Sequence, residues 1–396
     1  MLDFRKLIQQ IDQVGSDGLQ STLSQEDALI AAREAYKEAL AHKEEFVEKL
    51  DRNAPWTWWP TAMPIEPIDK HIEVRIVDQP VTVVAVDGSQ IMPSHHEIHS
   101  CFLLNIGSAI ISYGVKAPPI LDTEPRLFHR NEDLYPLVDR RRMHIDELYV
   151  SLERQMLELE KLVEFSLNAV YRGAPVVALV DGSLIPWSVE KMPSGYHDTY
   201  LARMAQEVEK LQDAGIPIFG YLSHSRSADI VNDLRVFVCP YQDSHCRDLC
   251  GHLNEEDFPC SKIWPMSDRM LVAENLKFGH RTAAFQSGAS VTKMMDAKQR
   301  ICFSYLNVGN EIARIEFPRW LLDHEELLNN SLSAVLAQVR KGMGYPVCLA
   351  EAHHLAVIRG PDRQKFFDMI ARQLVQFGLK PVKVSPKESR KRNSFI

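Results

Sequence analysis

The sequence contains no long apolar run. No stretch of its 396 residues approaches the ~20 consecutive apolar residues of a membrane-spanning helix. The opening residues Met1–Lys6 are not followed by the apolar stretch of a signal peptide. Its seven cysteines are an odd number in a long chain, which fits a reducing compartment better than a disulfide framework. We therefore expect a cytoplasmic protein with no membrane partner.

An excess of basic charge is also missing. The formal net charge is -8, so a nucleic-acid partner would require a local basic patch on an otherwise acidic surface. Hydrophobic residues make up 45% and charged residues 25%, which is ordinary for a globular protein. A chain of this length can bury one large domain with additions.

One short sequence motif, Val-Asp-Gly-Ser, occurs twice, at 86–89 and at 180–183. Each copy ends an apolar, mostly β-branched run, at 81–86 and at 176–180, and such runs predict buried strands. Gly and Ser then mark the exit from the strand. Each aspartate is therefore expected at the carboxyl end of a core strand, where open α/β sheets gather their ligands.

The two aspartates, Asp87 and Asp181, indicate a metal site. A single aspartate at a strand end can simply cap the following turn. Two of them can converge on a divalent cation, because hard cations prefer carboxylate oxygens and the cation's charge allows carboxylates to share a site.

The chain divides into three expected regions. Residues 1–70 combine a helical arm, expected from a cap at Ser24 and a helix over 28–50, with a Trp- and Pro-rich segment that wraps onto the core. Residues 71–379 form the main domain, and 380–396 form a basic tail that is either a binding segment or a solvated end.

The order of elements in the main domain predicts an α/β, RNase H-like mixed sheet flanked by helices. Such folds include nucleases with two-metal carboxylate sites, and this analogy predicts an acidic residue on the long helix. Glu160 and Glu164 both lie at the margin of its apolar stripe; periodicity slightly favours Glu160, and either can be a surface glutamate. The expected strands are 81–86, 98–106, 108–115, 176–180 and 216–222, and the expected helices are 138–171 and 198–213.

These residues resemble the NurA family of DNA-repair nucleases. The matching pieces lie between about 80 and 375 and comprise both Asp-Gly-Ser motifs, Arg314–Pro318 and the stretch from Gly344-Tyr345-Pro346 to His353. The resemblance implies an RNase H-like fold and a Mn²⁺-dependent deoxyribonuclease, acting as a 5′–3′ exonuclease on DNA ends in double-strand-break repair. It also implies a homodimer that works with a hexameric HerA-type ATPase. Mg²⁺ is the alternative ion, because carboxylates accept either.

The resemblance also implies the site residues. Asp87 and Asp181 match the two strand aspartates, and Glu164, seventeen residues before Asp181, matches the helix glutamate, which decides for Glu164 over Glu160. Tyr345 and His353 match the late Tyr and His. Asp87, Glu164, Asp181 and His353 would hold the metal, and Tyr345 would bond a phosphate oxygen or order the water. The alternatives are a core histidine and a packing tyrosine in a turn.

The sequence departs from the family where the predicted strand 216–222 runs into Gly220–Arg226. Relatives typically carry a lysine there, so His224 or Arg226 replaces it or the contact is absent. This departure bears on substrate affinity. Arg140–Arg142, before the long helix, are better placed for DNA contact than the basic tail.

A Cys-rich insertion over 239–262 has no counterpart in the resemblance. Cys239, Cys246, Cys250 and Cys260 are interleaved with His245 and His252, a ligand density suited to structural Zn²⁺ or an iron–sulfur cluster. The spacing is irregular, and reduced cysteines in a loop-rich insertion are an equal alternative.

Two rival functions stay open. The first is a DNA-binding or scaffold protein that keeps the fold but has little nuclease activity. The second is a phosphatase-like hydrolase with a closed pocket. The sequence leaves open the polarity of digestion, exo or endo action and strand preference.

Overall fold

A computed structural model describes residues 3–92 and 101–378. The chain forms two compact units. Unit 1 comprises Met1–Arg75, Tyr221–Lys293 and Arg300–Arg319, and unit 2 comprises Ile76–Gly220, Met294–Gln299 and Trp320–Ile396. The region expected as one domain, 71–379, is thus divided between the units, and the Cys-rich insertion belongs to unit 1. The expected tail at 380–396 lies outside the described residues.

Unit 2 is built on a mixed sheet in the order β5–β4–β3–β8, with β9 beginning beside β8. Strands β3, β4 and β5 form an antiparallel meander, and β8 runs parallel to β3 from Thr82↔Val176 to Val86↔Val180. A helix, α4, connects the meander to β8, as the RNase H-like prediction requires. The strands are β3 (Val81–Ile91), β4 (Phe102–Tyr113), β5 (Ile120–Phe128), β8 (Val176–Asp181) and β9 (Ile218–Leu222).

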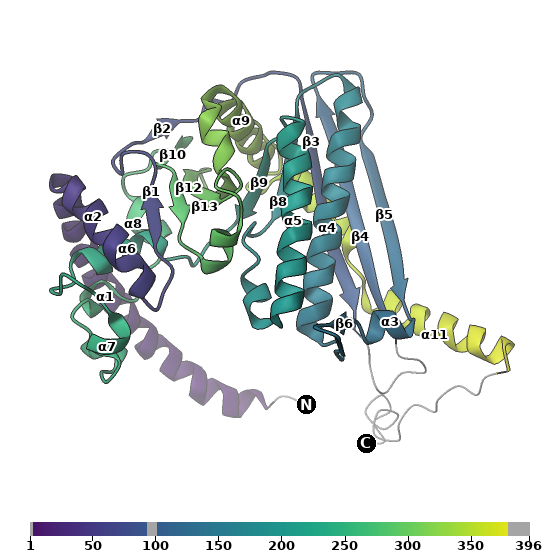
Figure 1. Ribbon diagram of the computed structural model, residues 1–396, viewed down its shortest axis with the longest axis horizontal. Coiled ribbons are helices and arrows are strands. Elements are labelled where there is room, and N and C mark those ends of the chain that lie inside the picture. The colour runs from purple at the N-terminus through teal and green to yellow at the C-terminus, as the bar shows by residue number, and fades with distance from the viewer. Residues whose placement is uncertain (1–2, 93–100, 379–396) are drawn as a thin grey trace. The chain divides into compact units, whose positions relative to one another are not determined.

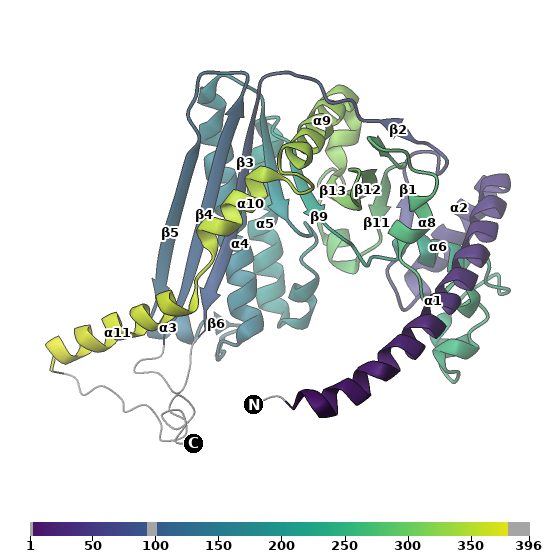
Figure 2. The same cartoon turned by 180° about the vertical axis from the view of Figure 1, so that it is seen from behind.

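Helices cover both faces of this sheet. Figure 1 shows α4 and α5 side by side across one face, and Figure 2 shows α10 across the other. On α4, the apolar-stripe residues Leu152, Met156 and Val163 are buried. The helices are α3 (Asn131–Leu134), α4 (Glu147–Ala169), α5 (Ser194–Asp213), α9 (Glu325–Lys341), α10 (Val347–Ala356) and α11 (Gly360–Gln376).

Several boundaries in unit 2 differ from the sequence prediction. The strand expected over 81–86 does not end before the first Asp-Gly-Ser motif, because β3 continues to Ile91. The meander does not break near residue 107, because β4 continues through Gly107 and the third strand lies at 120–128. The long helix begins at Glu147, where the Asp146 side chain accepts a hydrogen bond from the Tyr149 amide at 2.8 Å and caps it. The residues expected to extend it instead form a small hairpin, β6 (Leu137–Val138) and β7 (Arg141–Arg142).

Unit 1 combines helices with an antiparallel sheet in the order β1–β11–β12–β13. The N-terminal helix starts well before Ser24, because Asp3 caps α1 (Phe4–Ala41). Trp- and Pro-rich residues after it are ordered, and β1 (Ala62–Pro64) pairs with β11 (Phe285–Ser287). The other elements are α2 (Lys43–Asn53), β2 (Ile72–Glu73), α6 (Asp229–Phe237), α7 (Cys246–Cys250), α8 (Asp268–Ala273), β10 (His280–Arg281), β12 (Ile301–Asn307) and β13 (Ile312–Pro318).

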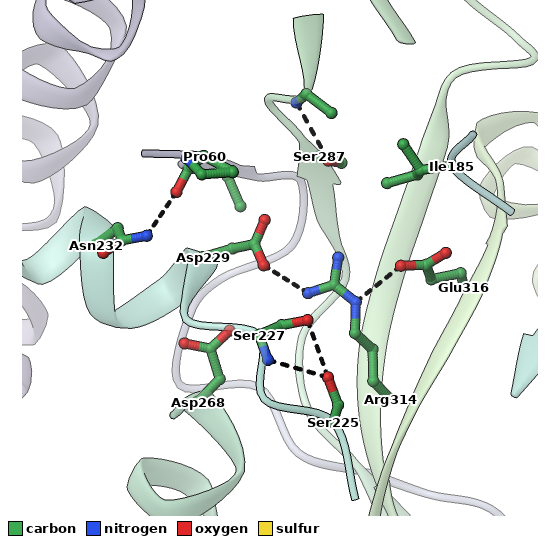
Figure 3. Close-up of polar contacts among 12 residues, drawn as sticks. Pro60, Ile185, Ser225, Ser227, Asp229, Asn232, Asp268, Ser287, Arg314 and Glu316 are labelled. Atoms are coloured by element: carbon green, nitrogen blue, oxygen red, sulfur yellow. Dashed lines mark hydrogen bonds and ion pairs between the residues drawn. The ribbon is translucent and has the colours of Figure 1, made fainter. Parts of the chain in front are cut away.

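The core of unit 1 contains a buried ionic network around Arg314 on β13 (Figure 3). Its guanidinium donates to Asp229 Oδ2 at 2.7 Å and to Glu316 Oε1 at 2.9 Å. Asp268, also buried, accepts from the Val231 amide and the Tyr305 hydroxyl, each at 2.8 Å. The Arg314–Pro318 motif is therefore a core strand in which opposite charges are paired.

Across residues 3–92 and 101–378, the helices are too short or too polar to cross a membrane.

Candidate functional site

The two Asp-Gly-Ser motifs meet at one place in unit 2. Val86 and Val180 are the last paired residues of the parallel strands β3 and β8, so Asp87 and Asp181 follow side by side. β8 ends at Asp181, whereas β3 continues to Ile91. The aspartates therefore lie where one edge of β3 loses its parallel neighbour, which leaves the edge accessible to side chains from other elements.

Helix α10 brings His353 to Asp87. The His353 Nδ1 atom lies 2.7 Å from Asp87 Oδ2. This approach depends on Gly107, which pairs with Asp87 across the sheet; a Cβ at that position would overlap the α10 backbone at Ala352 and Ala356. The Ser89 hydroxyl and the Asn105 amide both donate to the Ala356 carbonyl and fix the end of the helix.

Tyr345, just before α10, contacts the second aspartate. Its hydroxyl forms a hydrogen bond with the Asp181 carboxylate. A left-handed Gly344 (φ 125°) precedes it and turns the chain from α9 into α10. The structure thus brings together four of the five predicted site residues: Asp87, Asp181, Tyr345 and His353.

The third carboxylate of the cluster is Glu158 on α4, which the sequence analysis did not select. Gly88, the glycine of the first motif, leaves room for it: a Cβ there would overlap Glu158 Oε1. The Gly88 amide donates to the Glu158 carboxylate. Arg154, one turn earlier, donates to the Gly88 carbonyl at 2.7 Å and to Glu158 Oε1 at 2.9 Å. The glycine of the first motif therefore lies within β3 and serves the close approach of the helix, and it does not form a turn.

Glu164 does not lie in this cluster, which corrects the predicted placement. Its side chain is 52% exposed and its carboxylate pairs with Lys161 at 3.1 Å. Glu160 pairs with Arg203 at 2.8 Å and is also engaged elsewhere.

The difference follows from the dimensions of the elements. A strand advances ~3.3 Å and a helix ~1.5 Å per residue, so the steps from Val176 to Asp181 correspond to about eleven residues of helix. Counting back from Ala169, where α4 ends, leads to Glu158, whereas Glu164 is level with the middle of β8. Counting back the same eleven residues from the helix end that the sequence predicted, residue 171, leads to Glu160, so finding Glu158 requires the observed end at Ala169.

The carboxylates crowd one another electrostatically. Desolvation raises the pKa of Glu158 to about 7; repulsion by Asp87 and Asp181 adds to this shift, and Arg154 opposes it. The pKa of Asp181 is also raised, first by desolvation and then by Asp87, while Tyr345 and His353 lower it. The site thus holds more negative charge than its own side chains neutralise.

Three carboxylates and an imidazole are a suitable donor set for Mn²⁺ or Mg²⁺. In the described part of the chain, no three Asp, Glu, His or Cys side chains are already closed around a point that could hold a metal. In this structure His353 is bonded to Asp87 and Arg154 to Glu158. The excess negative charge still fits a cation, which would relieve the repulsion among the carboxylates.

The carboxylates open onto a cavity of about 290 Å³ that Asp87, Glu158 and Asp181 line together. Trp187, 39% exposed, forms part of its wall. It is the largest apolar side chain of the lining, and its indole offers a stacking surface beside the acidic groups.

Fold and site together define a class: an α/β protein with an RNase H-like strand order and carboxylates where the pairing of its two parallel strands ends. The family model of the NurA domain matches residues 81–358, so the chain belongs to the NurA domain family and the resemblance is confirmed. The matched range includes all five clustered residues, Asp87, Glu158, Asp181, Tyr345 and His353.

Two solved structures are similar to the chain. One is the crystal structure of the NurA nuclease from Sulfolobus solfataricus, with 14% identity and a TM-score of 0.46 over 95% of this chain and 98% of that one. The other is LC9-RNase H1, a type 1 RNase H with the type 2 active-site motif, with 11% identity and a TM-score of 0.22 over 39% of this chain and 68% of that one. No protein with a curated description matches the sequence.

Proposed function

We propose that this protein is a metal-dependent deoxyribonuclease whose active site is the Asp87–Glu158–Asp181 cluster. One observation carries the proposal: three carboxylates from β3, α4 and β8 share a cavity, where burial, and then repulsion by Asp87 and Asp181, raise the pKa of Glu158. Membership of the NurA domain family, in which one relative is described as a nuclease, supports the choice of substrate.

The chain's own residues have distinct roles in this proposal. Asp87, Glu158 and Asp181 hold the metal, and Arg154 keeps the Glu158 carboxylate oriented through its bond at 2.9 Å. His353 fixes Asp87 and can take or release a proton at Nδ1. Tyr345 orients Asp181 through its hydroxyl. The bound metal would supply a lowered pKa for water and neutralise charge on the phosphodiester.

The finer expectations belong to the same proposal. We propose Mn²⁺ as the ion in preference to Mg²⁺, digestion of DNA ends in the 5′–3′ direction, and a role in double-strand-break repair in the cytoplasm. A homodimer acting with a hexameric HerA-type ATPase completes it. The family resemblance supports these points, and size-exclusion chromatography with light scattering, alone and with such an ATPase, tests the assembly.

The decisive experiment compares Asp87→Asn and Asp181→Asn with the parent on end-labelled linear DNA and on circular DNA, with Mn²⁺, Mg²⁺ or no metal. We expect the parent to degrade linear DNA only with metal, and each variant to lose about 100-fold or more of the rate. Asp122→Asn, on the exposed strand β5, is the matched control and should retain the parental rate. End-label release gives the polarity.

If Asp87→Asn and Asp181→Asn digest DNA as fast as the parent, the site assignment is wrong. If the parent binds DNA but digests none with any metal, the protein is the DNA-binding or scaffold protein of the alternative hypothesis.

A further inference from the structure

The Cys-rich segment of unit 1 gathers four thiols. Cys250 and Cys260 are buried with Phe258 in a small core, against which Trp59, Val238 and Leu249 pack. The Cys246 sulfur is close enough to interact electrostatically with the sulfurs of Cys239, Cys250 and Cys260. The Cys250 sulfur interacts in the same way with those of Cys239 and Cys260. We call Cys239, Cys246, Cys250 and Cys260 the thiol cluster; all four are free cysteines.

We propose that the thiol cluster binds one structural Zn²⁺ ion through four sulfur ligands. This inference is independent of the proposed nuclease function, because the cluster lies in unit 1 and the carboxylates lie in unit 2. Tetrahedral zinc takes four thiolates at ~2.3 Å, and it is the common structural ion for such a set.

Sulfur supplies the ligands in this proposal, because His245, the histidine beside Cys246, is engaged elsewhere. The His245 ring stacks on Trp56 with centroids 4.5 Å apart and planes 12° apart. Its Nδ1 atom lies 3.6 Å from the Asp248 carboxylate. His252 is exposed. The sequence pattern includes both cysteines and histidines as candidate metal ligands, and the structure favours the cysteines.

The surroundings of the cluster suit the negative charge of a zinc tetrathiolate. The Trp58 backbone amide donates to the Cys246 sulfur, as amides do around metal-bound thiolates. Arg235 is buried at 1% exposure, with its Cζ 3.7 Å over the ring of Trp59, which packs against the cluster. Within the described residues, the Arg235 Nε and Nη2 atoms have no hydrogen-bond partner, although Nη2 lies 3.6 Å from Glu255.

Zinc binding would release the thiol protons, because the metal takes its sulfur ligands as thiolates. No three ligand side chains in the described residues already converge on one point, so the four sulfurs must close around the ion by side-chain rotation.

A metal also explains how this segment holds its shape. Its regular structure is limited to the five-residue helix α7 and to short turns at Glu255–Asp257 and Ser261–Ile263. Residues 251–257 are exposed, so few side chains are available to bury. A tetrahedral cross-link stabilises a segment of this kind where packing is sparse. Phe258, Trp59 and Leu249 occupy the space around the sulfurs, which favours one ion over the larger iron–sulfur cluster.

The test begins with the metal content of the full chain, purified under reducing conditions without chelator, by inductively coupled plasma mass spectrometry. We expect about one zinc per chain, and near-complete loss of it in Cys→Ser variants of each cluster residue. Cys101→Ala and His252→Ala should keep the zinc. Asp87→Asn should also keep it, which separates the thiol cluster from the carboxylate site.

A second measurement does not depend on whether the variants fold. Co²⁺ is titrated into the metal-depleted parent protein, and sulfur-to-cobalt charge-transfer bands with the visible bands of tetrahedral cobalt are expected. Absence of zinc together with absence of these bands overturns the proposal. Iron with acid-labile sulfide, or a loss of free thiols showing disulfides, overturns it as well.

Discussion

Glu158 is held in its position by two neighbours. Gly88 leaves the space in which its carboxylate lies, and Arg154 bonds the same oxygen that a Cβ on residue 88 would displace. Glu158→Gln keeps the volume of the side chain and an oxygen for the Gly88 amide but removes the charge. We expect the rate of DNA digestion to fall by about 100-fold, with little change in thermal stability.

Glu160→Gln and Glu164→Gln are the matched controls, because both residues lie on the same helix and form ion pairs outside the cluster. Such partly exposed pairs contribute little to stability, so both variants should digest DNA at the parental rate. A loss of activity in Glu164→Gln with Glu158→Gln unaffected would restore the sequence-based assignment.

The sequence predicted the aspartates more securely than the glutamate for a physical reason. Asp87 and Asp181 directly follow the apolar runs that pair as parallel strands, so they lie side by side although β3 itself continues to Ile91. A residue on the connecting helix is placed by where that helix ends, and residue spacing along the chain cannot substitute for that position. Tyr345 and His353 came from family resemblance alone, since no local pattern links them to either strand.

At the scale of elements, the packing of α10 on the sheet depends on Gly107. We expect Gly107→Ala to push α10 from the sheet, because the added Cβ would meet its backbone at Ala352 and Ala356. His353 would then lose its bond to Asp87, and digestion should fall by about 10-fold or more. Digestion rate and melting temperature are measured together.

Gly360→Ala provides the comparison for this change. Gly360 begins α11, and a Cβ there would meet no atom within 4 Å. This variant should match the parent in both rate and melting temperature. Parental activity in Gly107→Ala would mean that the close approach of α10 is not needed for the site.

Gly107 also explains an error in the predicted strands. The predicted strands 98–106 and 108–115 are divided at Gly107, although β4 is continuous from Phe102 to Tyr113. The role of this glycine is a close approach by another element, which involves residues almost 250 positions later in the sequence. Local patterns therefore predicted the order of elements, and contacts distant in sequence set their boundaries.

The β6–β7 hairpin presents the arginines expected to contact DNA. Asp139 and Arg140 have left-handed backbones (φ 49° and 62°), which form its tight turn, and Asp139 Oδ2 accepts from the Gly195 amide at 3.3 Å. Arg140→Ala with Arg141→Ala removes two exposed charges and spares Arg142, which bonds the Tyr135 carbonyl. We expect weaker DNA binding and a salt dependence of log Kd reduced by about two units of slope.

Fluorescence anisotropy at several salt concentrations measures both quantities. Lys6→Ala with Arg75→Ala makes the same change in net charge, but each of these side chains already pairs with an adjacent acid. That control should leave the slope near the parental value. An unchanged slope in the hairpin variant would place the DNA contact elsewhere.

At the scale of the whole molecule, the two units carry different polar chemistry. The clustered carboxylates of unit 2 open onto a cavity. In unit 1, the carboxylates near Arg314 are buried in the core. Asp229, Asp268 and Glu316 lie around Arg314 (Figure 3), and Asp233 is buried within electrostatic reach of Asp229 and Asp268. In the described residues, Asp229 Oδ1 and Asp233 Oδ2 lack hydrogen-bond partners, so this network is under-compensated. Replacing one member should therefore change how stability depends on pH.

Asp268 is the clearest position for that test. Burial, and then repulsion by Asp229, raise its pKa well above the ordinary carboxyl value. The folded state therefore holds a proton at pH values where the unfolded chain has lost it, so this residue favours folding at low pH. That contribution is lost as pH rises from about 4 through the raised pKa. Asp268→Asn removes the titration while keeping the shape.

We therefore expect the variant to gain stability relative to the parent as pH rises. The difference in free energy of unfolding between Asp268→Asn and parent should change by more than about 1 kcal/mol between roughly pH 5 and pH 8, as measured by urea denaturation. Asp51→Asn, on the exposed side of α2, should show a difference that is constant with pH. A constant difference for Asp268→Asn would mean that Arg314 fully compensates the buried charge, and that the network stabilises unit 1 as a set of neutralised ion pairs.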